Sequence, residues 1–124
     1  MMAITPEMRS FDRGIDLFNN GQFFAAHEVL EDLWRGVSAG QPLRLQMQGM
    51  VQLAVAFHHV SIGNMVGARS VLERAARNLD GADASFPGLD IDRLREELGQ
   101  WQEYLGESRH IAPALPKIML RRAC

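Results

Sequence analysis

The segment from Pro42 to about Ile62 constrains the fold of this chain more than any other part of the sequence. Its apolar residues lie on nearly every side of a helix: Met47, Met50, Val51, Leu53, Ala54, Val55, Ala56, Phe57 and Val60. A helix without a continuous polar face is usually buried by neighbouring elements on several sides. The sequence therefore predicts a central helix around which the rest of the chain packs.

Four further segments have apolar residues three and four positions apart, which is the spacing of an amphipathic helix. We expect these helices at about residues 6–19, 22–35, 65–79 and 91–105. Helix-capping residues stand before three of them, at Thr5, Asn64 and Asp90. Glycine-containing turns follow at Asn19-Asn20-Gly21 and at Gly63.

No segment alternates apolar and polar residues convincingly, so we predict no strands. Residues 81–88 are expected to form a loop, and the tail at 110–124 is expected to lie mostly extended over the body. The predicted fold is all-α: a compact five-helix bundle in which residues 1–124 form a single domain.

Residues 21–31 and 63–73 resemble each other, with Gly, Ala, Val, Leu and Glu at equivalent positions. In both segments a small residue follows five positions after the glycine, at Ala26 and Ala68, where two antiparallel helices can pack closely. The pattern resembles the tetratricopeptide helical hairpin, although two copies are fewer than a stacked array requires. The alternative is that two amphipathic hairpins of similar length resemble each other by chance.

Composition excludes several functional classes. The net charge is −2, with 13 basic and 15 acidic residues, which argues against a general nucleic-acid binder and against an anionic membrane partner. The one cysteine, Cys124, cannot form an internal disulfide, so a reducing, cytoplasmic location is the simplest interpretation. We find no signal peptide and no apolar run of about 18 residues that could span a membrane.

One cluster of polar residues could carry a function. His27 and Glu31 lie one helical turn apart on the same face, and Trp34 continues that face. On the central helix, Gln52 and His59 form a polar stripe that also includes Gln48. Because unpaired buried polar groups cost about 1–3 kcal/mol, we expect the two stripes to face each other.

Three interpretations of this cluster remain open. The polar groups could satisfy one another and orient the helices, or the cluster and Trp34 could line a pocket for a small ligand or peptide. Alternatively, His27, Glu31 and His59 could hold a divalent metal ion. The resemblance to the zinc-protease sequence His-Glu-x-x-His is superficial, because Glu31 stands at the position of the second histidine.

Two blocks of sequence resemble the DUF309 family, a group of small, mostly bacterial proteins of unknown function. The blocks are Phe18-Asn19-Asn20-Gly21-Gln22-Phe23-Phe24-Ala25-Ala26-His27-Glu28-Val29-Leu30-Glu31-Asp32-Leu33-Trp34 and Gln48 to His59, continuing at Gly63 to Ala68. The resemblance covers about residues 8–80 and leaves out residues 90–124. It implies an all-helical bundle and no particular activity. The family's polar positions correspond to His27, Glu28, Glu31, Trp34, Gln52 and His59.

The leading interpretation is a non-catalytic module with a polar cleft between the helices at 22–35 and 42–62. Its partner would be a small ligand or another protein, and self-association is compatible with the apolar helix faces. The alternative is a small metal-dependent enzyme that uses His27, Glu31 and His59.

Overall fold

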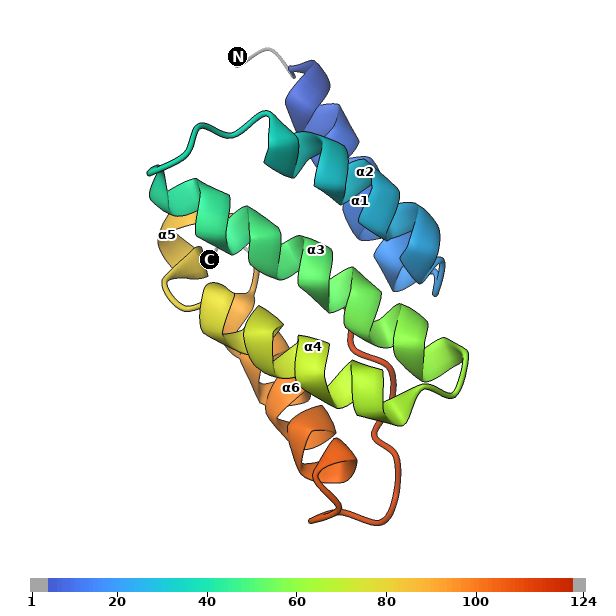
Figure 1. The fold of residues 1–124 in the computed structure, drawn as a ribbon. Coiled ribbons are helices and arrows are strands. Elements are labelled where there is room, and N and C mark those ends of the chain that lie inside the picture. Colours follow the sequence, from blue (N-terminus) through green and yellow to red (C-terminus); the bar gives the residue numbers. More distant parts are fainter. Residues whose placement is uncertain (1–4, 122–124) are drawn as a thin grey trace.

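The computed structural model describes residues 5–121, which contain helices and connecting segments (Figure 1). The helices are α1 (Pro6–Asn19), α2 (Phe23–Arg35), α3 (Pro42–Ser61), α4 (Met65–Asn78), α5 (Ala82–Ser85) and α6 (Ile91–Leu105). Residues 5–121 contain no strand. They do contain an isolated antiparallel β-bridge between Leu89 and Leu120. The all-α prediction is therefore confirmed, and the five long helices begin and end within one residue of the expected positions.

The expected loop at 81–88 contains a sixth helix, α5, which corrects the five-helix prediction. Its four residues are too few to show a helical period in the sequence. Its position is fixed by a contact distant in sequence, since the Ser85 hydroxyl donates a hydrogen bond of 2.8 Å to Gln46 of α3.

The predicted helix starts are capped by side chains. Thr5 Oγ1 accepts from Met8 N at 3.1 Å, and Asn64 Oδ1 accepts from Gly67 N at 3.0 Å. Asp90 caps α6 in the same way. These caps satisfy amide groups that the first turn of a helix leaves without partners.

Helices α2, α3 and α4 lie side by side, with α3 in the middle, while α1 lies behind α2 and α6 behind α4 (Figure 1). The turns between α1 and α2 and between α3 and α4 each contain a glycine in the left-handed region, Gly21 at φ 78° and Gly63 at φ 80°. That region favours glycine because a Cβ atom would clash there. The chain therefore folds into two helical hairpins.

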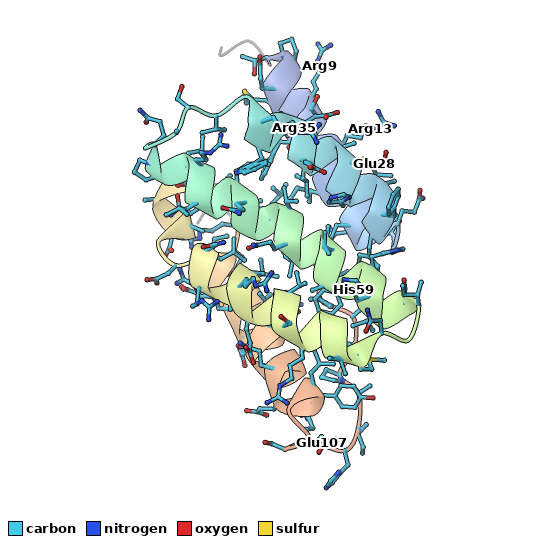
Figure 2. The ribbon with its side chains drawn as sticks, in the orientation of Figure 1. Arg9, Arg13, Glu28, Arg35, His59 and Glu107 are labelled. Carbon is cyan, nitrogen blue, oxygen red and sulfur yellow. The ribbon has the colours of Figure 1, made fainter. Side chains whose placement is uncertain are left out.

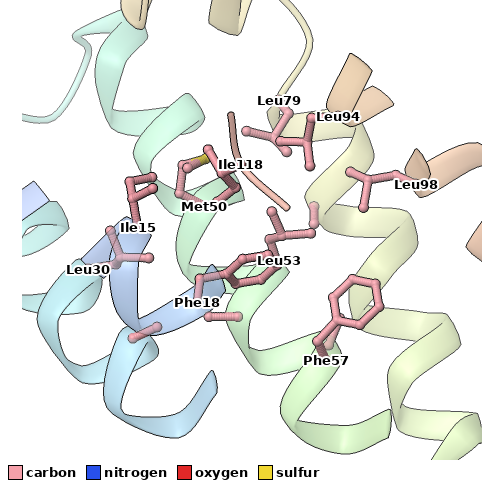
Figure 3. Packing of buried hydrophobic residues seen from close by; sticks show 14 of the residues in the cluster. Ile15, Phe18, Leu30, Met50, Leu53, Phe57, Leu79, Leu94, Leu98 and Ile118 are labelled. Carbon is pink, nitrogen blue, oxygen red and sulfur yellow. The ribbon is translucent and has the colours of Figure 1, made fainter. Parts of the chain in front are cut away.

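The core confirms the central position of α3. Met50, Leu53 and Phe57 are fully buried (Figure 3). The Phe57 ring makes edge-on contacts with Phe18 of α1 and Trp101 of α6, at 6.1 and 5.1 Å between ring centroids. Phe57 of α3 thus contacts both the first and the last of the long helices.

Ala26 and Ala68 are both 0% exposed, as the comparison of the two hairpins predicts. The small side chains allow the paired helices to approach closely at these positions.

The tail turns back after α6 and packs on the body without forming a further helix within the described residues, as expected (Figure 1). The Asn19 side chain donates to the Ile118 carbonyl at 2.9 Å and accepts from its amide at 2.8 Å. Trp101 Nε1–H donates to the carbonyl of Ala114 at 2.9 Å. Cys124 lies outside the described residues.

Among residues 5–121, no helix is both long enough and apolar enough to cross a membrane.

Candidate functional site

A row of charged and polar side chains runs along α2. His27 Nε2 lies 2.9 Å from one carboxylate oxygen of Glu31, and Arg35 Nη2 lies 2.9 Å from the other. Each pair is four residues apart, so the side chains meet on one helix face, as predicted for His27 and Glu31. The side chains of His27 and Glu31 are 24% and 29% exposed, so the carboxylate is half-buried between its two partners. We call His27, Glu31 and Arg35 the α2 polar row.

Trp34 lies three residues after Glu31 on α2 and is held against the start of α3. The Arg44 guanidinium lies 4.5 Å from the centre of the Trp34 ring and donates to the backbone carbonyls of Trp34 and Val37. Such stacking combines cation–π attraction with packing. The Trp34 Nε1–H is buried and has no hydrogen-bond partner among the described residues.

Arg44 is a site residue that sequence reasoning missed. An arginine in the first turn of a helix is usually solvated and is not favoured there by the helix dipole. Its pairing with Trp34 depends on how α2 and α3 pack, and the helical period along either segment carries no information on that packing.

Phe24 joins the other end of α2 to α3 and was also missed. Its ring is 5.8 Å from that of His27 and 5.3 Å from that of His58, although the residue is 55% exposed. Of the two adjacent histidines on α3, it is therefore His58 whose ring lies, tilted, beside the ring of an α2 side chain. The sequence analysis assigned that position to His59.

Gln52 and His59 bond to α4 and its cap instead of to α2. Gln52 Oε1 accepts from Asn78 Nδ2 at 2.8 Å, and His59 Nδ1 lies 3.2 Å from Asn64 Nδ2. The expected contact between the two polar stripes is thus not present: no hydrogen bond or ion pair within residues 5–121 joins them. The physical reason is that α3 packs between two helices, and its polar stripe lies on the side nearer α4.

The predicted metal set is not assembled in the described part of the chain. No three His, Cys, Asp or Glu side chains among residues 5–121 are placed to hold a metal ion. His27 and Glu31 meet on α2, but His59 has a different partner, Asn64. Figure 2 labels His59 near the end of α3 and Glu28 on α2, and Glu28 is exposed.

The second hairpin contains an equivalent of the His27–Glu31 pair. At the matching positions of α4, Arg69 Nε lies 3.7 Å from Glu73 Oε1, and these side chains are 57% and 52% exposed. An exposed pair of this kind contributes little to stability. The two hairpins therefore share the spacing of the pair but differ in its burial and in its surroundings.

The fold and the polar face define a small helical module. The chain belongs to the family described as "Domain of unknown function (DUF309)", whose model matches residues 11–71. The matched segment runs from α1 into α4 and includes all six predicted site residues: His27, Glu28, Glu31, Trp34, Gln52 and His59. The family resemblance is confirmed.

Two bacterial relatives are uncharacterised proteins. One, from Aquifex aeolicus (strain VF5), is 26% identical over 106 residues, which cover 86% of this chain and 31% of the relative. The other, YpuF from Bacillus subtilis (strain 168), is 30% identical over 73 residues, which cover 59% of this chain and 41% of the relative. In both cases the match spans less than half of the relative's length.

Proposed function

We propose that this chain is a non-catalytic binding module and that its ligand lies along the seam between α2 and α3. We define the α2–α3 seam as Phe24, His27, Glu31 and Trp34 of α2 with Arg44 and His58 of α3. The fold supports this proposal because hairpins that pack side by side, as in tetratricopeptide proteins, present an extended surface along their helices.

The observation that carries the proposal is how the α2 polar row is bonded. His27 and Arg35 both bond to Glu31 on the same helix, and among the described residues no hydrogen bond or ion pair joins this row to α3. The His27–Glu31 pair of this row is therefore half-buried without serving to hold the helix pair together. Helix pairing is achieved by the apolar core and by Arg44.

The chemistry of the seam defines what it would bind. The Glu31 carboxylate accepts hydrogen bonds, while the buried Trp34 Nε1–H is a donor without a partner among the described residues. Phe24 provides an exposed aromatic face beside two imidazole rings. A ligand with both donors and acceptors and an apolar side group, such as a short peptide or an amino-acid derivative, matches this set.

The two tryptophans allow a direct test by NMR. Trp34 and Trp101 each give an indole N–H resonance, and Trp101 serves as an internal reference because its N–H is bonded to Ala114. Pools of dipeptides and amino-acid derivatives are added to labelled protein. We expect a seam ligand to shift the Trp34 indole resonance, assigned from the Trp34→Phe variant, and to leave that of Trp101 in place.

A matched pair of variants separates binding at the seam from general charge effects. Glu31→Gln should abolish the ligand-induced shift, whereas Glu73→Gln removes the same charge at the equivalent position of α4 and should preserve it. The proposal fails if no pool moves the Trp34 resonance, or if the two variants bind a ligand equally well.

A further inference from the structure

A second surface, independent of the seam and of the function proposed above, lies where α1, the end of α2, the start of α3 and α5 meet. It is a groove with a volume of about 590 Å³, within the range of ligand sites. We call it the end groove; its lining includes the apolar Met8, Phe11, Leu43 and Met47 and the acidic Glu7, Asp12 and Asp32. It shares no residue with the seam.

The interior of the end groove is apolar. The rings of Phe11 and Phe86 stack at 5.1 Å with an angle of 10° between their planes, and buried Met47 is also part of the lining. Met8 and Leu43 are 47% and 38% exposed. Water therefore reaches large apolar side chains here, and covering them would stabilise a complex.

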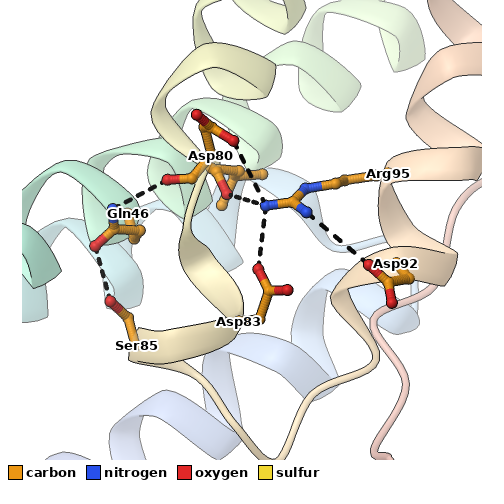
Figure 4. Close-up of polar contacts among 7 residues, drawn as sticks. Gln46, Asp80, Asp83, Ser85, Asp92 and Arg95 are labelled. Atoms are coloured by element: carbon orange, nitrogen blue, oxygen red, sulfur yellow. Dashed lines mark hydrogen bonds and ion pairs between the residues drawn. The ribbon is translucent and has the colours of Figure 1, made fainter.

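Hydrogen bonds hold the α5 side of the groove in place. Gln46, which is 8% exposed, accepts from the Ser85 hydroxyl and donates to the Asp80 carbonyl at 3.2 Å (Figure 4). Arg95 of α6 lies 3.2 Å from the Asp83 carboxylate and donates to the carbonyl of Leu79 at 3.1 Å. Because these bonds fix α5 and with it Phe86, a ligand would find the groove already formed.

Among residues 5–121, the charged residues that line the groove are all acidic. Glu7, Asp12 and Asp32 line it, and no lysine, arginine or histidine of this part of the chain does. Arg35 lies 3.6 Å from Asp32, but these side chains are 65% and 80% exposed, so solvent screens the pair. The chain as a whole has a net charge of only −2, so the excess of acid is a local property of this groove.

We propose that the end groove docks an amphipathic, basic helical segment of a partner protein. Its apolar side chains would cover Met8, Phe11 and Leu43, and its lysines or arginines would lie against the three carboxylates. An amphipathic helix in a preformed apolar groove is a common mode of peptide recognition, and the acidic lining selects a basic helix over an acidic one.

The test uses two synthetic peptides that differ only in charge. A fluorescein-labelled helical peptide carries leucines at positions i, i+3, i+4 and i+7 with lysine elsewhere, and its control has glutamate in place of lysine. In fluorescence anisotropy, we expect the basic peptide to bind at least about tenfold more tightly. Its affinity should fall as the salt concentration rises from about 0.05 M to about 0.3 M.

Two variants of α3 localise the binding. Leu43→Ser removes an apolar contact from the groove without changing its charge and should weaken binding of the basic peptide by about tenfold. Leu45→Ser makes the same change two residues away, at a side chain that is 55% exposed and lies outside the groove, so this variant should bind the peptide within about twofold of the wild type. Circular dichroism of both variants confirms that they fold.

Two charge variants complete the test. The triple variant Glu7→Gln, Asp12→Asn, Asp32→Asn should lose most of the salt-dependent affinity. A triple variant with the same net charge, Glu73→Gln, Glu96→Gln, Glu103→Gln, should keep it. The proposal is overturned if either matched pair binds equally well, or if the acidic peptide binds as tightly as the basic one. It is also overturned if the protein forms a dimer that Leu43→Ser dissociates and Leu45→Ser does not, because the occupant would then be a second copy.

Discussion

Gly49 of α3 provides a quantitative test of how the second hairpin is packed. A Cβ atom at this position would lie 2.9 Å from Leu79 Cγ and 3.1 Å from the Leu79 backbone nitrogen. Leu79 is 1% exposed, and its amide is bonded to the Ala75 carbonyl at 2.9 Å, so neither its side chain nor its backbone can move away cheaply. The Gly49→Ala variant must therefore overpack the contact between α3 and α4.

The expected change in the free energy of unfolding is the difference between a gain in helix propensity and a cost of overpacking. Alanine is favoured over glycine inside a helix by about 0.8–1 kcal/mol. Overpacking a well-filled core costs about 1–3 kcal/mol. We expect Gly49→Ala to lower the free energy of unfolding by about 1 kcal/mol, because the clash with a fixed backbone atom exceeds the gain in helix propensity.

Gly99 of α6 is the matched control. It also lies inside a helix, but apart from its chain neighbours and its own helix backbone, no atom of residues 5–121 would lie within 4 Å of a Cβ atom there. Gly99→Ala should therefore raise the free energy of unfolding by about 0.8–1 kcal/mol. Urea unfolding followed by helical circular dichroism measures both variants, and their difference gives the packing cost. If Gly49→Ala were as stabilising as Gly99→Ala, the close approach of α3 and α4 would be refuted.

Further variants test the other contacts of the fold. Ala26→Leu and Ala68→Leu should each lower the free energy of unfolding by about 1–3 kcal/mol, because both sites are fully buried; unchanged urea midpoints would show that neither alanine has a packing role. Gln46→Leu leaves the Ser85 hydroxyl without its acceptor and should speed amide hydrogen exchange in α5; unchanged exchange would mean that Gln46 does not fix this helix. Asn19→Ala removes both side-chain bonds to the tail and should speed its proteolysis, whereas wild-type resistance would show that other contacts hold the tail.

Much of the fold could be predicted from sequence because its signals are local. The long helices are marked by apolar spacing, and their limits are set by single residues such as Thr5, Asn64 and Gly21, whose predicted effects are seen as caps and a left-handed turn. The central position of α3 follows from its lack of a polar face. These properties depend only on residues a few positions apart.

The remaining features depend on contacts between distant residues. Helix α5 is fixed by Ser85 and Gln46, which are 39 residues apart, so no local pattern could reveal it. The expected contact between Glu31 and Gln52 is not present for a related reason. The helical period placed each residue on a face, but α3 has neighbours on two sides, and Gln52 bonds to Asn78 of α4. The helical period shows which residues share one face of a helix, but it does not show which neighbouring helix packs against that face.

Comparison of the two hairpins shows which side chains helix packing requires and which positions can vary. The two hairpins have the same residue where their paired helices pack: Ala26 and Ala68 are at equivalent positions and both are fully buried. One position later they differ, since His27 is a half-buried imidazole bonded to Glu31, whereas Arg69 of α4 is part of an exposed ion pair. The hairpin of α3 and α4 forms with the exposed pair, so the hairpin architecture does not itself demand a half-buried histidine. Packing of the hairpin therefore does not require the polar row of α2, and the ligand proposed above for the α2–α3 seam would give this row a role.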